Sequence, residues 1–328
     1  MHPAFSVIFL TTLIGVGQGL FLALYTSELY AAVRVLPAGI DTRVFYGEGS
    51  ALALGFLMAG LIASMFHLGH PERGWRAVAR WRTSWLSREV ILLPAFMAVV
   101  FLYGLAHYTG WNPVLATLGA EGRVAVTLTL VMGGIGTLLA FGLFVATGMI
   151  YACLKFLREW ATPLTVINFI LMGGASGFMA ATAWAAWQAP GLVQFYAVWS
   201  LILTTFAMLG RTAAWIRNAR LKPVSTLQTA IGVRHTRIVQ KSQGAMGGSF
   251  NTREFFHGKP EGFVCRMMWT GMIMSFLVPV LLLTVAIATN AHALFAAAFV
   301  TQYLGLIAER WTFFAQARHP QNLYYQTV

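Results

Sequence analysis

Eight long apolar runs constrain this chain more than any other feature of its sequence. They lie at roughly 6–33, 49–67, 89–108, 123–152, 164–187, 193–210, 267–289 and 292–314. Runs of about 20 apolar residues can cross a bilayer as helices, whereas the strands of a transmembrane β-barrel would alternate in polarity. Only 10% of the residues are charged, against about 25% in soluble domains. The sequence therefore predicts an all-α integral membrane protein, a single domain of residues 1–328 with eight transmembrane helices in a bundle.

The first apolar run and the cysteines narrow the class further. The run has no cationic segment before it and is longer than the apolar part of a signal peptide, so we interpret it as a retained helix. The sequence has two cysteines, Cys153 and Cys265. Two distant thiols exclude a disulfide framework, a Cys-x-x-Cys metal site and an iron–sulfur cluster held by this chain alone. We expect no metal site in this chain.

Basic residues are distributed unevenly between the connections. Eight helices put both termini on one side of the membrane, together with the connections 68–88, 153–163 and 211–266. This side carries 19 of the 22 Lys and Arg residues. The other side carries three of them: Arg34, Arg43 and Arg123. Because cytoplasmic loops are enriched in Lys and Arg, we predict cytoplasmic termini for a multi-pass protein of the bacterial inner membrane.

The longest connection, residues 211–266, lies between the sixth and seventh predicted helices. It is polar and contains ten Lys and Arg residues. We predict that it is a cytoplasmic loop that docks a partner subunit. The net charge of +12 follows mostly from this asymmetry, so it does not indicate nucleic-acid binding. A basic face also suits an acidic partner or anionic membrane lipid.

Two ionisable residues, His67 and Glu89, lie where helices meet the predicted cytoplasmic surface. His67 ends the second run and Glu89 begins the third. Ionisable residues at membrane depth are costly and are functional candidates by default. Since consecutive helices run antiparallel, the two side chains lie at similar depth and could face one pocket.

A histidine and a carboxyl at the membrane edge suit proton exchange with a quinone. Reduction of a quinone to a quinol takes two electrons and two protons. Histidine titrates near neutrality and can hydrogen-bond a carbonyl, and a half-buried glutamate can relay protons. The pair thus indicates binding of a quinone, either ubiquinone or menaquinone.

Simpler interpretations of these residues remain open. Ser87 could cap the third helix, which would make Glu89 a first-turn acid favoured by the helix dipole, and His67 could cap the second helix. We interpret Glu28 and Glu309 as paired or snorkelling residues, and His107 and His292 as interfacial. These histidines do not offer axial pairs at matched depth, so no haem is expected.

The connection between His67 and Glu89 is rich in arginine and tryptophan. On a helix, Arg73, Arg76 and Arg80 would share a face, and tryptophans would lie at headgroup height. This pattern is typical of an interfacial anchor. It is also compatible with a cover over the quinone pocket and a contact surface for a cytoplasmic partner.

Three segments of the chain resemble one known family. They are MHPAFSVIFLTTL at the start, FHLGHPERGWRAVARWRTSWLSREV from residue 66, and QTAIGVRHTRIVQKSQGAMGGSFNTREFFHG from residue 228. Together they resemble the membrane-anchor subunits of the dimethyl sulfoxide reductase family. The resemblance implies an eight-helix, haem-free anchor for an iron–sulfur electron-transfer subunit and a molybdopterin catalytic subunit, with these cofactors only in the partners.

The resemblance also implies where quinone reacts. The family's site depends on a histidine in HLG and a glutamate in SREV, which are His67 and Glu89 here. Gly69 and Arg73 match further positions of the first motif. With the Arg- and Trp-rich connection covering the pocket, Trp85 and Arg88 complete the supporting candidates.

The family includes anchors of complexes that work in either direction. Reductases take electrons from quinol, and the sulfite-oxidising members hold their catalytic subunits in the cytoplasm and reduce quinone. The basic cytoplasmic loops and the long 211–266 connection favour sulfite oxidation. A dimethyl sulfoxide or similar reductase is the alternative. A secondary transporter, which would show inverted repeats, and a purely structural anchor are less favoured.

Overall fold

The computed structural model describes residues 1–36, 41–119, 124–223, 225–239, 241 and 255–324. The described part contains eight helices that are long and apolar enough to span a membrane, as predicted. They are α1 (Phe5–Ala32), η1 with α2 (Arg43–Glu48 and Gly49–Met65), α3 (Trp85–Thr109), α4 (Leu128–Ala152), α5 (Pro163–Gln188), η4 with α6 (Pro190–Leu192 and Val193–Ala219), α9 with η5 and α10 (Glu261–Met272, Ile273–Leu277 and Val278–Thr289), and α11 (His292–Ala315).

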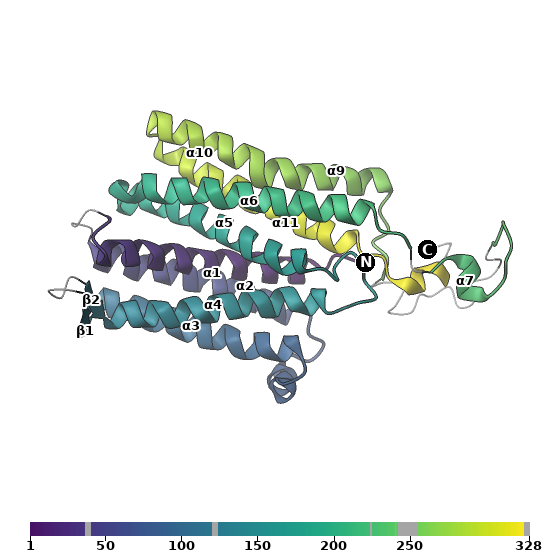
Figure 1. The fold of residues 1–328 in the computed structure, drawn as a ribbon, viewed down its shortest axis with the longest axis horizontal. Helices are drawn as coiled ribbons and strands as arrows, with labels where there is room; N and C mark the ends of the chain where they lie inside the picture. Colours follow the sequence, from purple (N-terminus) through teal and green to yellow (C-terminus); the bar gives the residue numbers. More distant parts are fainter. Residues whose placement is uncertain (37–40, 120–123, 224, 240, 242–254, 325–328) are drawn as a thin grey trace.

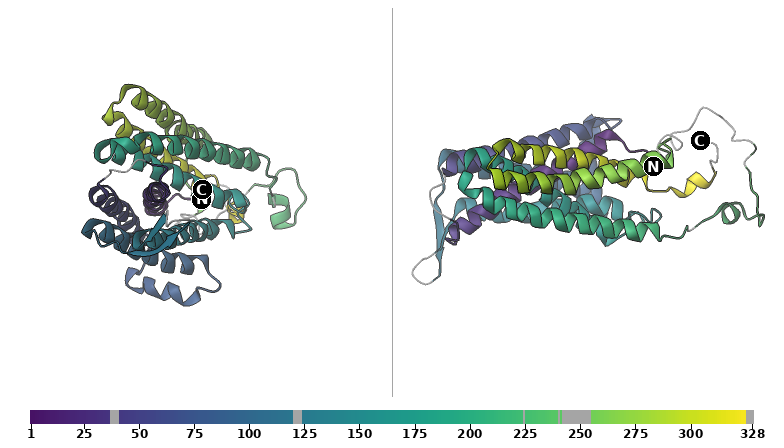
Figure 2. Two further views of the ribbon diagram at one scale, coloured as in Figure 1. Left: turned by 60° about the vertical axis from the view of Figure 1, so that its left-hand side comes forward. Right: turned by 90° about the horizontal axis from the view of Figure 1, so that it is seen from above.

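The helices run up and down in a bundle with two distinct ends (Figure 1). The first and last described residues, 1 and 324, lie at one end, together with the short helices α7 (Leu227–Ile231) and η6 (Pro320–Tyr324). We call this the near end. The opposite, far end carries a two-stranded antiparallel hairpin of β1 (Val114–Leu118) and β2 (Val124–Thr127), and the view from above in Figure 2 shows the same separation.

Helices α1 and α5 form the centre of the bundle and are its most buried spans. Glycines spaced four residues apart line their contact on both helices. A Cβ on Gly19 would lie 2.9 Å from the carbonyl carbon of Gly173, and one on Gly177 would lie 2.3 Å from Cα of Gly19. Small residues at this spacing let two membrane helices approach closely. This crossing brings the polar side chains of α1 next to those of α4 and α5.

The hairpin at the far end departs from the all-α prediction. Residues 124–127 were expected to begin the fourth helix, and they form strand β2 instead. Valine and threonine favour strands, and Thr127 then caps α4 by accepting a hydrogen bond from the amide of Leu130 at 3.4 Å. Arg123, which was counted on this side, lies outside the described residues.

The connection between the sixth and seventh spans is shorter than predicted. Helix α6 continues to Ala219 because Arg211 is buried within the bundle, and α9 begins at Glu261. The connection between these helices therefore covers residues 220–260, whereas the sequence predicted 211–266. Residues 242–254, a large part of the predicted docking loop, lie outside the part of the chain that the structure describes.

Candidate functional site

Glu89 lies in the second turn of α3 and points into the bundle. Ser84 caps this helix by accepting a hydrogen bond from the amide of Ser87 at 3.3 Å. The cap is thus three residues earlier than the predicted Ser87, and Glu89 is not in the first turn. Its carboxyl is 8% exposed and accepts a hydrogen bond from the Thr147 hydroxyl of α4 at 2.5 Å. Glu89 therefore contacts residues inside the bundle and does not stabilise the start of its own helix.

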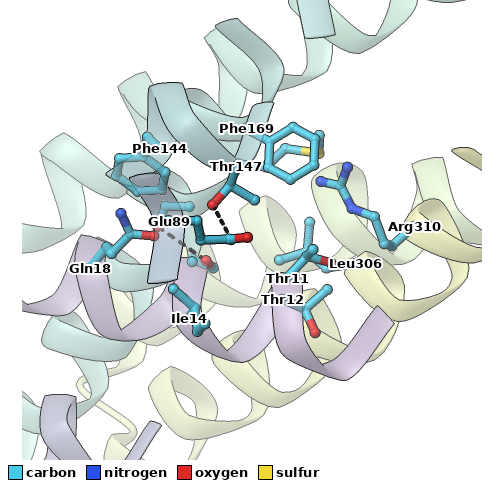
Figure 3. A pocket seen from close by; sticks show the side chains of 14 residues that line it. Thr11, Thr12, Ile14, Gln18, Glu89, Phe144, Thr147, Phe169, Leu306 and Arg310 are labelled. Carbon is cyan, nitrogen blue, oxygen red and sulfur yellow. Dashed lines mark hydrogen bonds between the residues drawn. The ribbon is translucent and has the colours of Figure 1, made fainter. Parts of the chain in front are cut away.

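A small cavity adjoins the Glu89 carboxyl (Figure 3). Its polar lining comes from four helices besides α3: Thr11, Thr12 and Gln18 of α1, Thr147 of α4, Ser176 of α5, and Arg310 of α11. Phe144 and Phe169 contribute aromatic walls. The cavity offers about 20 Å³ to water, and one water molecule needs roughly 10–15 Å³ measured in this way. The site can hold water beside a carboxyl group.

A buried trio of charged residues continues from this cavity toward the near end. Arg211 Nε lies 2.7 Å from Glu309 Oε1, and Arg310 Nε lies 3.8 Å from Glu309 Oε2. All three side chains are at most 5% exposed. The Arg310 guanidinium also lies 4.0 Å from the Phe169 ring centroid, a cation–π distance. Gly271 of α9 makes room for the trio, since a Cβ there would lie 2.9 Å from the amide nitrogen of Glu309.

His67 occupies a different environment from Glu89. It follows the end of α2, and its side chain is exposed and is not among the residues that line the Glu89 cavity. Its imidazole has no hydrogen-bond partner in the described part of the chain, so it does not cap α2. The surrounding protein removes part of its water and thereby lowers the pKa of His67. The structure brings His67 and Glu89 to the same end of the bundle without joining them in this cavity.

The connection between them forms a short 3₁₀ helix, η2 (Pro71–Arg80), with no buried residue. A 3₁₀ helix has three residues per turn, so Trp75, Val78 and Trp81 align on one exposed face. Arg73 lies outside that face and contacts Glu72, with Nε 3.6 Å from Oε1. None of these residues lines the Glu89 cavity.

The remaining supporting candidates also lie outside the cavity. A Cβ on Gly69 would meet nothing within 4 Å. Arg88 donates to the carbonyls of Trp81 and Arg82 at 3.0 and 2.9 Å and covers the Trp85 ring at 4.1 Å. Arg88 and Trp85 thus hold the turn that joins η2 to α3.

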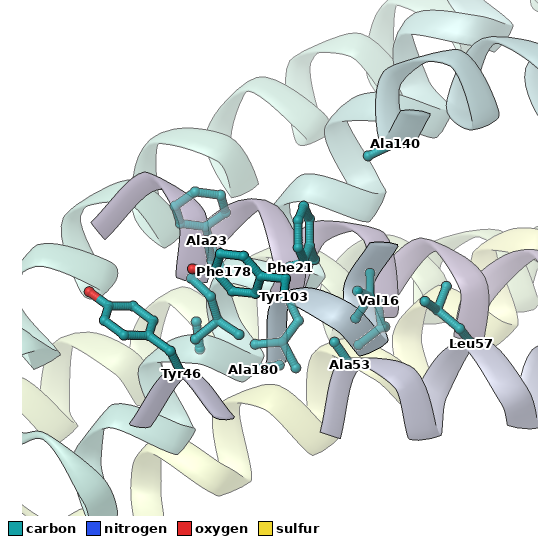
Figure 4. Close-up of a cluster of buried hydrophobic side chains, with 14 of the residues drawn as sticks. Val16, Phe21, Ala23, Tyr46, Ala53, Leu57, Tyr103, Ala140, Phe178 and Ala180 are labelled. Carbon is teal, nitrogen blue, oxygen red and sulfur yellow. The ribbon is translucent and has the colours of Figure 1, made fainter. Parts of the chain in front are cut away.

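A second buried carboxyl, Glu28, lies at the far end. It accepts hydrogen bonds from the hydroxyls of Tyr103 at 2.6 Å and Thr129 at 2.5 Å, and His107 Nε2 lies 3.3 Å away. Figure 4 shows Tyr103 among the surrounding apolar side chains. Glu28 and Glu309 were interpreted as paired or snorkelling residues, and both are paired. His107 is 5% exposed and not interfacial as predicted, because Glu28 provides it with a partner, whereas His292 is exposed.

The described residues contain no group of three or more His, Cys, Asp or Glu side chains that could hold a metal ion. Both cysteines are free and exposed. The Glu89 cavity brings together a carboxyl, hydroxyls, a guanidinium and room for water.

Comparison with known proteins places the chain in a family. The family described as DMSO reductase anchor subunit (DmsC) matches residues 1–316. The chain belongs to the DMSO reductase anchor subunit family. It is 56% identical to a sulfite dehydrogenase subunit of Allochromatium vinosum over 328 residues, which cover 100% of both proteins. As a member of an anchor-subunit family with eight apolar helices in its described part, the chain is membrane-integral.

In this member of the DMSO reductase anchor family, much of the site could not be found from local sequence. Thr147, Gln18 and Thr11 are ordinary residues within apolar runs, and only the crossing of α1 with α5 beside α4 brings them to Glu89. Arg211 was assigned to a loop because the apolar run ends at residue 210. The sequence feature that could have placed Arg211 inside the bundle was Glu309, because a carboxylate within an apolar run needs a cation at the same depth.

Proposed function

We propose that this chain is the quinone-reactive membrane subunit of a sulfite-oxidising complex. The family resemblance implies an iron–sulfur electron-transfer subunit and a molybdopterin catalytic subunit as its partners. The 56% identity with a sulfite dehydrogenase subunit over the full length of both chains favours sulfite as the electron source. The second candidate, a reductase anchor that oxidises quinol, is favoured by the description of the family.

We further propose that the near end faces the cytoplasm and docks these partners. Arg211 and Arg310 are buried with Glu309 and so do not count as loop charges. Without them the near end still has 17 Lys and Arg residues in the sequence, against three at the far end. A C-terminal alkaline phosphatase fusion, which is active only after export, should be inactive. Activity of that fusion would reverse the orientation.

The observation that carries the proposed function is the environment of Glu89. Its carboxyl is buried near the membrane edge, receives one hydroxyl hydrogen bond and adjoins a water-sized cavity. A carboxyl that only stabilised the fold would be fully hydrogen-bonded or tightly ion-paired. A carboxyl with one partner and access to water can take up and release protons.

The residues around the cavity suit a quinone in chemistry but not in size. Hydroxyl groups and the Arg310 guanidinium can donate to a carbonyl oxygen, and Phe144 and Phe169 can stack on a ring. A space of about 20 Å³ for water does not admit a six-membered ring. We therefore assign the quinone head to the surface where His67 is exposed, outside the cavity, and assign proton exchange to Glu89.

The overall reaction balances without a metal in this chain. Sulfite and water give sulfate, two protons and two electrons at the catalytic partner, and a quinone takes up two electrons and two protons to become a quinol. When it is bound, the quinone is the acceptor of the two electrons. Glu89 holds and transfers a proton at its carboxyl. His67, whose lowered pKa favours the neutral imidazole, can donate an N–H to a carbonyl oxygen without adding a charge at the membrane edge.

The test compares two assays of the intact complex purified in detergent. Glu89→Gln and His67→Ala should each lower quinone-linked sulfite oxidation by about 100-fold or more, the range that a lost general acid produces. Sulfite oxidation with a soluble dye acceptor, which bypasses the quinone, should stay within about twofold, because the partner subunits are intact. A complex that assembles and keeps quinone-linked turnover in both variants would refute the site.

Two matched controls come from the far end. Glu28→Gln removes an equally buried carboxyl, and His292→Ala removes an exposed histidine. Neither should change quinone-linked turnover by more than about twofold, since neither residue lies at the near end. A purely structural anchor would instead respond to all four substitutions only through assembly of the complex.

A further inference from the structure

A second cavity lies between the Glu89 cavity and the near-end surface. Arg310, Phe169 and Met172 line both cavities and form the partition between them. The second cavity continues past Glu309 and Asn168 and offers about 10 Å³ to water, which is close to the space that one molecule requires. The two cavities together form a row of polar space along the inner side of α5.

Polar atoms in this second cavity lack hydrogen-bond partners. Both Glu309 oxygens, Arg211 Nη2, Arg310 Nε and Asn168 Oδ1 are buried and have no hydrogen bond within the described residues. The Glu309 oxygens have ion-pair contacts, but ion pairing alone leaves hydrogen-bonding capacity unused. Buried polar groups in native proteins are nearly always satisfied by protein or by ordered water. Water molecules in the second cavity are the partners that would satisfy them.

Besides the Arg211–Glu309–Arg310 trio, this region contains two carboxyl groups: the buried Glu89, and the half-buried Glu159 that lines the second cavity. The trio of Arg211, Glu309 and Arg310 has a net charge of +1. Figure 3 shows the Glu89 carboxyl and the Arg310 guanidinium extending into the same cavity from opposite sides. With Glu89 ionised, the four buried residues Glu89, Arg211, Glu309 and Arg310 have no net charge, and with Glu89 protonated they carry one positive charge. Arg310 therefore couples the proton on Glu89 to the charge of the second cavity.

The second cavity reaches the near end at the connection between α4 and α5. Glu159 and Asn218 line it there and are half-buried. The end of α6 holds this connection in place, because Arg217 donates to the carbonyl of Arg158 at 2.9 Å and Asn218 donates to that of Glu159 at 3.4 Å. The polar row thus extends from the surface of the near end to Glu89.

We propose that these two cavities and the Arg211–Glu309–Arg310 trio form a hydrated passage that conducts protons between the near-end surface and Glu89. The inference rests on the proposed role of Glu89. Waters and carboxyl groups in sequence can pass protons on without net movement of any residue. His67 lines neither cavity, so the passage does not include the proposed position of the quinone head.

Asn168→Leu tests the passage in the intact complex. Leucine has the same number and branching of side-chain heavy atoms as asparagine, and it would make the wall of the second cavity apolar. Quinone-linked turnover should fall by about tenfold, since a positioned relay contributes at least that much, and its slowing in D₂O should increase. Dye-linked sulfite oxidation and binding of a fluorescent quinol analogue should stay within about twofold.

Thr182→Val is the matched control on the same helix. Thr182 is equally buried, and its hydroxyl bonds to the Phe178 carbonyl at 2.9 Å and contacts Ser200 at 3.0 Å. It lines neither cavity, so all readouts should stay at their normal values. Unchanged quinone-linked turnover in Asn168→Leu, or an equal loss in both assays, would overturn the passage.

A third variant covers the case in which Asn168→Leu does not assemble. Arg310→Gln keeps the Arg211–Glu309 pair and removes the charge that faces Glu89, so the same slowing with the same isotope response is expected. Glu89→Gln separates the two proposals. If Glu89→Gln keeps full quinone-linked turnover, the proposed site fails. If it loses turnover while the passage variants keep theirs, only the passage fails.

Discussion

The buried carboxyl groups at the two ends of this bundle have different partners. At the far end Glu28 receives two hydroxyl hydrogen bonds and contacts His107. At the near end Glu89 receives one hydrogen bond, Glu309 has only ion pairs, and both adjoin cavities. Neither of these cavities includes a residue of the Glu28 group. Within the described residues, the far-end cluster leaves one buried atom, His107 Nε2, without a hydrogen bond, whereas the near-end trio leaves both Glu309 oxygens and nitrogens of both arginines without one.

The difference separates a structural role from a functional one. A cluster whose carboxyl is hydrogen-bonded through both oxygens, as Glu28 is, fixes helices relative to one another, and adding a proton to that carboxyl would disrupt it. A cluster with unused hydrogen-bonding capacity costs stability unless water enters. A membrane protein retains such a cluster where ions or protons must move. Because both carboxyls are equally buried, it is their partners, not their burial, that distinguish them.

Removal of the shared carboxylate of the near-end trio should have the largest effect on stability. Glu309→Met leaves two buried guanidinium groups with no carboxylate between them, at a cost of about 3–5 kcal/mol in the free energy of unfolding. Thermal unfolding of the purified chain in detergent measures this loss. The exposed Glu261 at the start of α9 is the control, and Glu261→Met should cost under about 0.5 kcal/mol. Equal losses in both variants would contradict the buried trio.

Neutralising the far-end carboxyl should affect stability and not turnover. Glu28→Gln keeps the shape of the side chain and weakens two charge-assisted hydrogen bonds, with an expected loss of about 2–3 kcal/mol. Thermal unfolding checks the stability, and quinone-linked turnover of the assembled complex checks the function. If turnover is lost while stability is unchanged, the far-end cluster is functional and the comparison fails.

The helices could be predicted from the sequence because a membrane-spanning helix needs a continuous run of about 20 apolar residues, which is a local property of the sequence. All eight runs correspond to helices, and the errors lie at their ends. Residues 124–127 are apolar enough to begin a transmembrane helix, and it is their pairing with residues 114–118 that makes them a strand. Arg211 ends an apolar run in sequence but continues a helix in space, because Glu309 is available as its partner.

The site could be predicted only in its ionisable residues. Glu89 stands out because a carboxyl beside an apolar run is rare. Its environment could not be predicted, since Thr147 and Gln18 are brought to it by helix packing over long distances in sequence. The packing signal was present in the glycines of α1 and α5 at four-residue spacing, but glycine spacing alone does not say which helices meet. Whether His67 joins Glu89 in function is a prediction that the quinone assays test.

Removal of one hydroxyl from the far-end cluster should have a smaller effect than loss of its carboxyl. Tyr103→Phe deletes a donor to Glu28 that lies 2.6 Å from Oε2 and keeps the ring that packs edge-on against Phe21. The expected loss is about 1–2 kcal/mol, measured by thermal unfolding. Tyr303→Phe, which removes a hydroxyl 3.4 Å from Thr12, should cost less because that contact is longer. The reverse order would mean that Glu28 does not depend on Tyr103.

Acidification should loosen the near end before the far end. His319 stacks on Phe255 with ring centroids 3.7 Å apart, and Asn322 donates to the Phe255 carbonyl at 3.1 Å. Burial lowers the pKa of His319, and of His257 nearby, below the ordinary value of 6.5. The unfolded segment therefore binds more protons than the docked one below pH 6.5. The stability of this contact is complete above that pH and is lost as the pH falls through it.

Hydrogen exchange measured by mass spectrometry at pH 7.5 and 5.5, corrected for the intrinsic rates, tests this difference. Residues 255–259 and 316–322 should lose protection by a few-fold at the lower pH, which corresponds to less than about 1 kcal/mol. His319→Gln cannot gain a proton and should show a smaller change. Strands β1 and β2 contain no histidine and should keep their protection. A uniform loss of protection at both ends would mean that acid acts on the bundle as a whole and that the near end is no more open than the far end.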